Sequence, residues 1–227
     1  MSSQTNTLTE GPLAKQIFLV SLPLALSNLL VARFYGARHP KDVEKTVHSA
    51  AIISAVAGVV LLLIGLLGSP AMLRLLNTKE DLLPGAILYL RVYFLGMPAL
   101  ALYNFGNAVF SAIGETKKPL YILSFAGVLN ILLNLFFVIV CNLDVAGVAL
   151  ASAISQCVSA GLILHALTRV QDCYALHFKE AKLDPSMTKS ILALGLPAGF
   201  QNAIFAIANL FIQALSLIHI SEPTRPY

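Results

Sequence analysis

Long uncharged apolar blocks separated by basic loops constrain the fold of this chain more than any other feature. The blocks occupy residues 46–73, 92–114, 119–143, 145–168 and a last stretch that begins at Ser190. Each block is long enough to cross the roughly 30 Å hydrocarbon core of a bilayer as an α-helix. The sequence therefore predicts an all-α fold, a polytopic membrane helix bundle with at least five spans.

The distribution of positive charge predicts the orientation of these spans. Ten of the fifteen Lys and Arg residues lie in three alternate loops, at 33–45, 115–118 and 169–189. The connections between them carry few cations, and the turn around Asp144 carries none. Because cytoplasmic loops of membrane proteins are enriched in Lys and Arg, we expect the three basic loops to face the cytoplasm.

The composition excludes several classes of function. Only 11% of the residues are charged and 57% are hydrophobic, whereas about 25% of a typical soluble domain is charged. The formal net charge of +4 is explained by cations beside the span ends, so we expect lipid and not nucleic acid as the partner. Cys141, Cys157 and Cys173 lie far apart, and no zinc site or disulfide framework is predicted.

The N-terminal region breaks the regular pattern. Residues 16–32 form a seventeen-residue uncharged run, which is at the short limit for a span. A single crossing here would place the N-terminus opposite the first basic loop, hence outside the cell. The run also passes from Asn28 into Arg33 with no turn signal. We interpret this as a missing helix between Asn28 and Val31.

Four ordered motifs carry a resemblance to a known family. They are LTEGP at 8–12 ahead of LPL at 22–24, VARFYGA at 31–37, GETKKP at 114–119 and GLPAG at 195–199. In order and spacing they resemble the multidrug and toxic compound extrusion (MATE) transporters. The resemblance implies twelve helices in two six-helix lobes with a substrate cleft between them. The four middle blocks would then be helices three to six, and the block from Ser190 would be helix seven.

This scheme divides the chain into five regions. We expect a cytoplasmic leader at 1–16, a truncated first lobe at 17–168 with a remnant of helices one and two, a cytoplasmic inter-lobe linker at 169–189, and the first helix of the second lobe at 190–214. Residues 215–227 resemble the translation of a transposase adapter used in sequencing-library preparation. We exclude that tail from functional reasoning.

The spans contain amide and hydroxyl groups in place of acids. All eleven Asp and Glu residues lie in loops or termini, although an ion-coupled transporter normally needs a carboxylate within the membrane. The polar candidates inside the predicted spans are Asn104, Asn107, Asn130, Asn134, Ser152, Gln156, Ser159, Gln201 and Asn202.

Two of these helix faces are predicted to meet. Asn130 and Asn134 are one turn apart, and Ser152, Gln156 and Ser159 repeat at helical spacing on the next block. The short connection at 142–144 makes the two blocks antiparallel neighbours. Amide and hydroxyl oxygens are hard ligands that suit a sodium ion or hydrogen bond a protonated acid. The alternative is interhelical hydrogen bonding alone, at about 0.6–2 kcal/mol per bond.

The family resemblance favours a cation site. It implies a first-lobe site built from an acid on helix one, an Asn and an acid or amide on helix five, and a hydroxyl on helix six. Asn130, Asn134 and Ser152 fall on the matching positions, with the neutral Asn134 where some members have Asp. The coupling ion would be sodium or a proton, with no other cofactor and no metal centre. Without the helix-one acid, we expect this chain to be an inactive fragment.

Prolines and aromatic residues complete the candidate features. Pro23 and Pro98 are predicted either to kink their helices or to lie near a helix start. Tyr103, Phe105 and Phe110 are candidates for an aromatic cleft that attracts organic cations, although core packing is the simpler interpretation.

Transport is the leading functional hypothesis. The intact protein is expected to be a monomeric antiporter in the bacterial inner (cytoplasmic) membrane, exporting small organic, often cationic, compounds by alternating access of two lobes. A lipid-linked oligosaccharide flippase of related fold would need a charge-lined cleft, and the predicted spans hold no central Lys or Arg. A membrane enzyme would need paired acids or a His and an acid near a span end, and the sequence contains no DxxD, HExxH or nucleophile-elbow motif. A non-transporting membrane scaffold is the remaining alternative.

Overall fold

The computed structural model describes residues 29–75, 80–177 and 182–221, and these residues form helices without a β-strand. The all-α prediction is therefore confirmed. The elements are α2 (Leu29–Gly36), α3 (Pro40–Leu75), the short 3-10 helix η1 (Glu80–Leu82), α4 (Leu83–Leu95), α5 (Met97–Ala112), α6 (Lys117–Leu135), the π-helical turn η2 (Phe136–Val140), α7 (Asp144–Thr168) and α8 (Pro185–Ser221).

Three helical segments among the described residues are long and apolar enough to cross a membrane. They are Pro40–Arg74, Lys117–Val140 and Asp144–Thr168. A fourth span is obtained when the bent pair Glu80–Leu95 and Met97–Ala112 is counted as one. Three of the five predicted blocks are thus confirmed as span-length helices, and the block at 92–114 falls on the bent pair. The fifth, from Ser190, lies within α8, and its crossing stays a prediction.

The block at 92–114 was predicted with the wrong limits. Its helix begins upstream, at Leu83, and is broken at Gly96, where α4 and α5 meet at an angle of 43°. The charge of Arg91 concealed this upstream half in the sequence, because an uncharged run marks burial in lipid and not the ends of a helix. One straight span is therefore replaced by a broken one.

The first basic loop is also more helical than its charge suggested. Helix α2 continues through Arg33 to Gly36, and α3 begins at Pro40. The intervening turn includes Arg38, whose φ of 56° is left-handed. Leu29 to Val31 are consecutive residues of α2. The residues before Leu29, including Pro23 and Asn28, lie outside the described part of the chain, so the missing helix stays a prediction.

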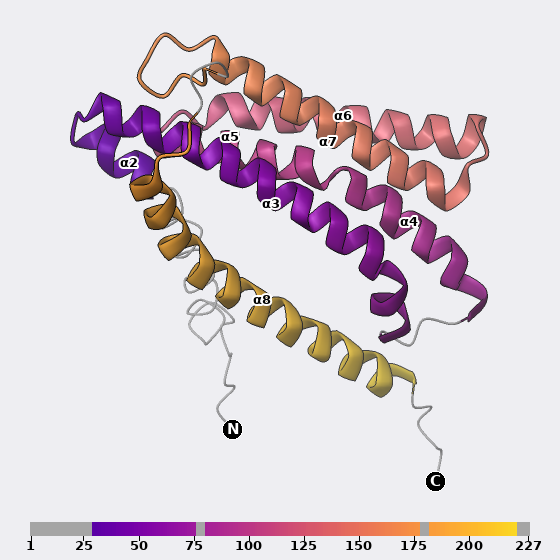
Figure 1. The fold of residues 1–227 in the computed structure, drawn as a ribbon. Helices are drawn as coiled ribbons and strands as arrows, with labels where there is room; N and C mark the ends of the chain where they lie inside the picture. Colours follow the sequence, from indigo (N-terminus) through magenta and orange to yellow (C-terminus); the bar gives the residue numbers. More distant parts are fainter. Residues whose placement is uncertain (1–28, 76–79, 178–181, 222–227) are drawn as a thin grey trace, which may run out of the picture. The chain divides into compact units, whose positions relative to one another are not determined.

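Residues Leu30–Thr188 form one compact unit in which α3 to α7 run side by side (Figure 1). Its core is a cluster of buried apolar residues from α3, α5, α7 and the segment after α7, among them Val43, Val47, Phe105, Phe110, Ile163, Leu167 and Leu176. Each Å² of apolar surface that such side chains remove from water stabilises the bundle by about 25 cal/mol. Phe105 and Phe110 belong to this core, as the simpler interpretation held.

The segment after α7 is anchored to this unit. Tyr174, Ala175 and Leu176 are buried, and the Leu176 backbone N–H donates to the Leu167 carbonyl (3.2 Å). The His177 backbone N–H donates to Nε2 of His48 on α3 (3.1 Å). Part of the region predicted as an inter-lobe linker therefore belongs to the compact unit Leu30–Thr188 and packs against its helices.

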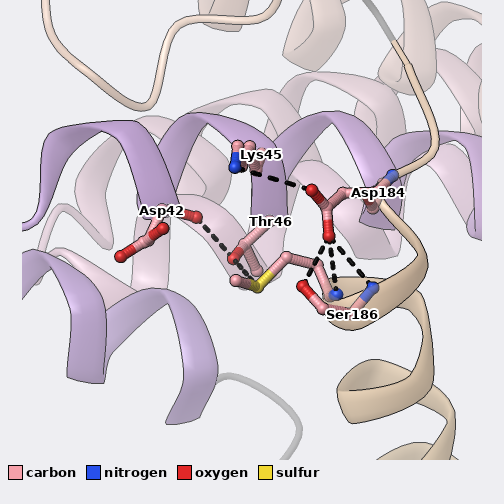
Figure 2. A network of polar contacts seen from close by, with 7 residues as sticks. Asp42, Lys45, Thr46, Asp184 and Ser186 are labelled. Atoms are coloured by element: carbon pink, nitrogen blue, oxygen red, sulfur yellow. Dashed lines mark hydrogen bonds and ion pairs between the residues drawn. The ribbon is translucent and has the colours of Figure 1, made fainter.

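A polar network fixes the start of α8 to α3 (Figure 2). Lys45 Nζ lies 3.6 Å from an Asp184 carboxylate oxygen, and the other oxygen accepts from the Ser186 hydroxyl (2.6 Å) and from the backbone N–H groups of Ser186 and Met187. The Ser186 hydroxyl and these backbone donors, with Lys45, hold the pKa of Asp184 below its ordinary value. Asp184 thus acts as an N-terminal cap of α8.

The second unit contains the rest of α8. The helix continues from Lys189 to Ser221 and includes Pro197. It runs through residue 214, where the sequence placed the boundary of the adapter-like tail. The division of the chain into lobes, linker and tail stays a prediction.

Candidate functional site

A pocket of about 770 Å³ lies between the α4–α5 pair, α6 and α7. Its size is within the range of small-molecule sites, roughly 300–1,000 Å³. Apolar and aromatic groups form part of its wall, and ten polar or hydroxyl-bearing side chains face it from the three sides: Tyr93, Tyr103, Asn104, Asn107, Thr116, Asn130, Ser152, Ser155, Gln156 and Ser159. None of these ten groups is an acid or a Lys or Arg.

The predicted meeting of the α6 and α7 polar faces is found in the structure. Asn130 Nδ2 on α6 donates to Ser152 Oγ on α7 at 3.5 Å, a long hydrogen bond. Asn134 Nδ2 donates to both oxygens of Asn130, the side-chain Oδ1 (3.0 Å) and the backbone carbonyl (2.9 Å). The three predicted cation-site residues therefore form one connected cluster across the helix pair.

This cluster contains an acceptor without a donor. Asn134 Oδ1 is buried and has no hydrogen-bond partner among the described residues. A buried amide oxygen without a partner is unfavourable by roughly 1–3 kcal/mol. A sodium ion or a protonated carboxyl group would satisfy it. A group of three or more His, Cys, Asp or Glu residues suited to a transition metal is not found in the described part of the chain.

The α7 wall of the pocket is built from small residues with hydroxyl groups. Ser155 donates to the Ala151 carbonyl (2.8 Å), Ser152 to the Val148 carbonyl (3.0 Å), and Ser159 to the Gln156 carbonyl (2.9 Å). Each hydroxyl hydrogen is thus used within the helix. The oxygen lone pairs remain as acceptors toward the pocket, so this wall favours a ligand that donates hydrogen bonds.

Tyr103 joins the pocket to the core. Its ring belongs to the buried core cluster and also lines the pocket, and its hydroxyl donates to the Pro119 carbonyl at the start of α6 (3.2 Å). Both interpretations of this residue, core packing and an aromatic wall, therefore apply.

The predicted site residues divide into three groups. Asn104, Asn107, Asn130, Ser152, Gln156 and Ser159 line the pocket, and Asn134 lies one turn beyond Asn130. Gln201 and Asn202 belong to α8 in the second unit, and their role stays a prediction. Pro98 lies in the first turn of α5, at the helix break. Sequence reasoning missed Tyr93, Thr116 and Ser155; only Ser155 had a signal, its spacing of three from Ser152.

Solved structures share this fold. A crystal structure of MATE in the bent conformation aligns with a TM-score of 0.77 at 23% identity, covering 89% of this chain and 47% of that one. An outward-facing multidrug resistance MATE transporter of the MOP superfamily aligns with a TM-score of 0.75 at 24% identity, covering 91% and 47%.

Several bacterial proteins are similar to the chain in sequence. The chain is 37% identical over 149 residues to the probable multidrug resistance protein YpnP of Bacillus subtilis, covering 65% of this chain and 33% of that protein. It is 26% identical over 210 residues to YoeA of the same species, covering 88% and 45%. It is also 26% identical over 204 residues to the multidrug export protein MepA of Staphylococcus aureus, covering 89% and 44%. The chain thus spans a third to just under half of these relatives.

The family model supplies the decisive comparison. The MatE model matches residues 15–136, more than half of the chain. That region includes α3 to α6 and the α6 half of the polar cluster. The chain belongs to the MatE family, the multidrug and toxic compound extrusion transporters, and is a multi-pass membrane protein.

Proposed function

We propose that this chain forms one lobe of an ion-driven efflux transporter for small organic compounds in the bacterial cytoplasmic membrane. Membership of a transporter family and the relatives named for multidrug resistance and export in Bacillus and Staphylococcus support this proposal. The observation that carries it is the pocket of neutral polar groups on span-length helices.

The Asn130–Asn134–Ser152 cluster is the proposed coupling site. It presents two amide oxygens and a hydroxyl oxygen, and the unpartnered Asn134 Oδ1 leaves one acceptor ready for a cation. Sodium prefers such hard oxygen ligands. Because these oxygens carry no formal charge, we expect weak sodium affinity from the cluster alone. A carboxylate supplied by another segment would convert it into a site that binds sodium or a proton.

Cation binding tests the coupling site directly. The parent chain in detergent is compared with Asn134→Asp by equilibrium dialysis against radioactive sodium. We expect Asn134→Asp to bind sodium at least tenfold more tightly, because it adds a charge beside two further oxygens. Asn104→Asp on α5 is the matched control, since it adds the same charge to the pocket wall at a residue outside the hydrogen-bonded cluster. Equal affinities in the two variants would refute the coupling site.

Transport tests the wider proposal. Alternating access requires two lobes, so we expect the 227-residue chain alone to give no ion-coupled efflux of ethidium from a drug-sensitive bacterial host. A chimera in which a MATE relative supplies the second lobe together with helices one and two should restore efflux, and a sodium or proton ionophore should abolish it. Efflux by the isolated chain, or a chimera indifferent to both ionophores, would contradict the proposal.

A further inference from the structure

The wall of the pocket contains a helix break whose local geometry is well defined. Pro98, in the first turn of α5, has no N–H to continue the hydrogen bonds of α4. The Gly96 N–H bonds only three residues back, to the Tyr93 carbonyl (3.0 Å), and the Leu100 N–H restarts the helix on the Gly96 carbonyl (2.9 Å). The result is the 43° bend between α4 and α5.

Gly96 is favoured at this bend by space and not by backbone conformation. Its φ of −79° and ψ of −11° are accessible to any residue. A Cβ atom at this position would overlap the Gln156 Oε1 atom of α7 and would lie 3.2 Å from the Ala153 Cα atom. The side-chain amide of Gln156 therefore occupies the volume that the missing Gly96 side chain leaves free.

Helix α3 is the second helix, after α7, that contacts the break. A Cβ atom on Gly58 would lie 2.6 Å from the Pro98 Cα atom and 3.3 Å from the Met97 carbonyl oxygen. Further along α3, a Cβ atom on Gly65 would overlap the ring of Phe94 on α4. Two glycines of α3 thus accept residues from both sides of the break, while Gln156 of α7 contacts the residue between them.

Gln156 also lies in the pocket wall, and its side-chain oxygen has no hydrogen-bond donor among the described residues. Gln156 Oε1 is buried and accepts no hydrogen bond from the described residues. The same side chain lines the pocket together with Tyr93 from α4 and Asn104 from α5. A change in the bend would move Tyr93 relative to Asn104, so the break determines the shape of the pocket.

We propose that Gln156 is a positioning residue for the pocket. Its amide packs on Gly96 from α7, while Gly58 of α3 packs on Pro98, and the two contacts together hold the bend between α4 and α5. This inference rests on the proposed function and extends it, because it takes the pocket that carries that proposal as the binding site for the organic compound. Its contribution is indirect, through the relative placement of the α4 and α5 walls. Replacing Gly96 by any larger residue should displace the amide and change the bend.

Pulsed electron paramagnetic resonance measures the bend without reference to transport. Spin labels are placed at the exposed Leu88 of α4 and Leu132 of α6, in a chain whose three cysteines are replaced by serine. Leu88 lies eight residues before Gly96, or about 12 Å along the helix, so a change of about 15° in the bend would move it by about 3 Å.

Four variants decide the outcome. We expect Gly96→Ala to shift the label distance by about 3 Å by the same helix geometry, and Gln156→Ala to broaden the distribution. In the double variant, Gly96→Ala with Gln156→Ala, the overlap with the amide is removed and only the 3.2 Å contact with the Ala153 Cα atom remains, so the mean distance should return toward the parent value. Gly161→Ala on α7, where an added Cβ atom meets nothing within 4 Å, should leave the distribution unchanged. An unaltered distance in Gly96→Ala, or a double variant no closer to the parent, would overturn the proposal.

Binding of rhodamine 6G, followed by fluorescence polarisation, separates this inference from the proposed function. Gln156→Ala should weaken binding at least threefold, whereas the adjacent exposed Cys157→Ala should not. Unchanged binding in Gln156→Ala would count against the positioning role. If the parent chain itself binds no dye, the function assigned to the pocket fails, while the distance measurement still decides whether Gln156 holds the bend.

Discussion

Helices α6 and α7 are adjacent and antiparallel, yet they are buried to very different extents. In the most apolar 18-residue window of each, 44% of the α7 residues are buried but only 6% of the residues in the α6 segment. The α7 window is nevertheless the less hydropathic of the two. Apolar character therefore does not indicate which of two membrane helices lies inside the bundle.

The difference follows from side-chain size. Apart from Ile163 and Leu167 near its C-terminal end, the buried face of α7 consists of small residues, which allow close approach of backbones in a membrane bundle: Gly147, Ala149, Ala151, Ala153, Ser155, Ser159 and Ala160. The exposed face of α6 carries large apolar side chains, including Tyr121, Phe125, Val128, Ile131 and Leu132. Since lipid tails are as apolar as leucine, large residues gain little by leaving them.

The largest expected effect is a charge on the exposed face of α6. Val128, near the centre of Lys117–Val140, is 58% exposed. If this face contacts lipid, Val128→Lys should reduce insertion by about 2.5–3.5 kcal/mol, the cost of a lysine at a helix centre. The inserted fraction is measured by translation into membrane vesicles. Tyr121→Lys, close to the basic end of α6, is the control, because its ammonium can reach the interface. Equal insertion of both variants would mean that protein, and not lipid, covers Val128.

Overpacking of α7 should have the next largest effect. Ala149 is fully buried, so Ala149→Leu should lower the free energy of unfolding by about 1–3 kcal/mol. Val128→Leu on α6 adds a methylene to an exposed position and should change it by less than about 0.5 kcal/mol. Thermal unfolding in detergent, followed by circular dichroism, compares the two. A tolerated Ala149→Leu would remove the distinction between the helices.

Two glycines of α7 should respond in opposite directions. A Cβ atom on Gly147 would lie 2.9 Å from the Phe137 Cβ atom of the neighbouring π-helical turn, whereas one on Gly161 would meet nothing within 4 Å. Gly147→Ala should therefore destabilise the chain by about 1 kcal/mol through overpacking. Gly161→Ala should stabilise it by up to about 1 kcal/mol through helix propensity. The same thermal assay measures both, and a stabilising effect of Gly147→Ala would show that packing at the α6–α7 turn is loose.

The sequence was sufficient for some of these features and insufficient for others. The α6–α7 hairpin and the Asn130–Ser152 contact could be predicted, because a short turn and a helical period together fix which side chains meet. Residues 83–91 of α4 could not, because Arg91 ends the uncharged run within the helix. A kink at Pro98 was one of the predicted alternatives, but the proposed role of Gln156 depends on contacts between α7 and Gly96, which lie far apart in the sequence. The burial of Tyr174 and Leu176 was hidden by the charged residues around them.

The smallest expected effect is the coupling between Asn130 and Ser152, the hydrogen bond that links the exposed helix to the buried one. At 3.5 Å it is long, and the Ser152 hydroxyl already donates to Val148. A double-mutant cycle with Asn130→Ala and Ser152→Ala should therefore give a coupling energy of about 0.6 kcal/mol, the average for interhelical bonds in a membrane protein. Asn130→Ala with Ser155→Ala is the control cycle, since Ser155 also donates within its own helix but, unlike Ser152, is not the acceptor of Asn130.

Repeating the cycle with and without sodium separates the two interpretations of this contact. A hydrogen bond that only joins helices gives the same coupling energy at every sodium concentration. A cation held by Asn130, Asn134 and Ser152 adds an interaction that both single variants remove, so the coupling should rise with sodium and not with choline. A sodium-independent coupling would leave α6 attached to α7 by packing and one weak bond, and would remove the cluster from any account of ion coupling.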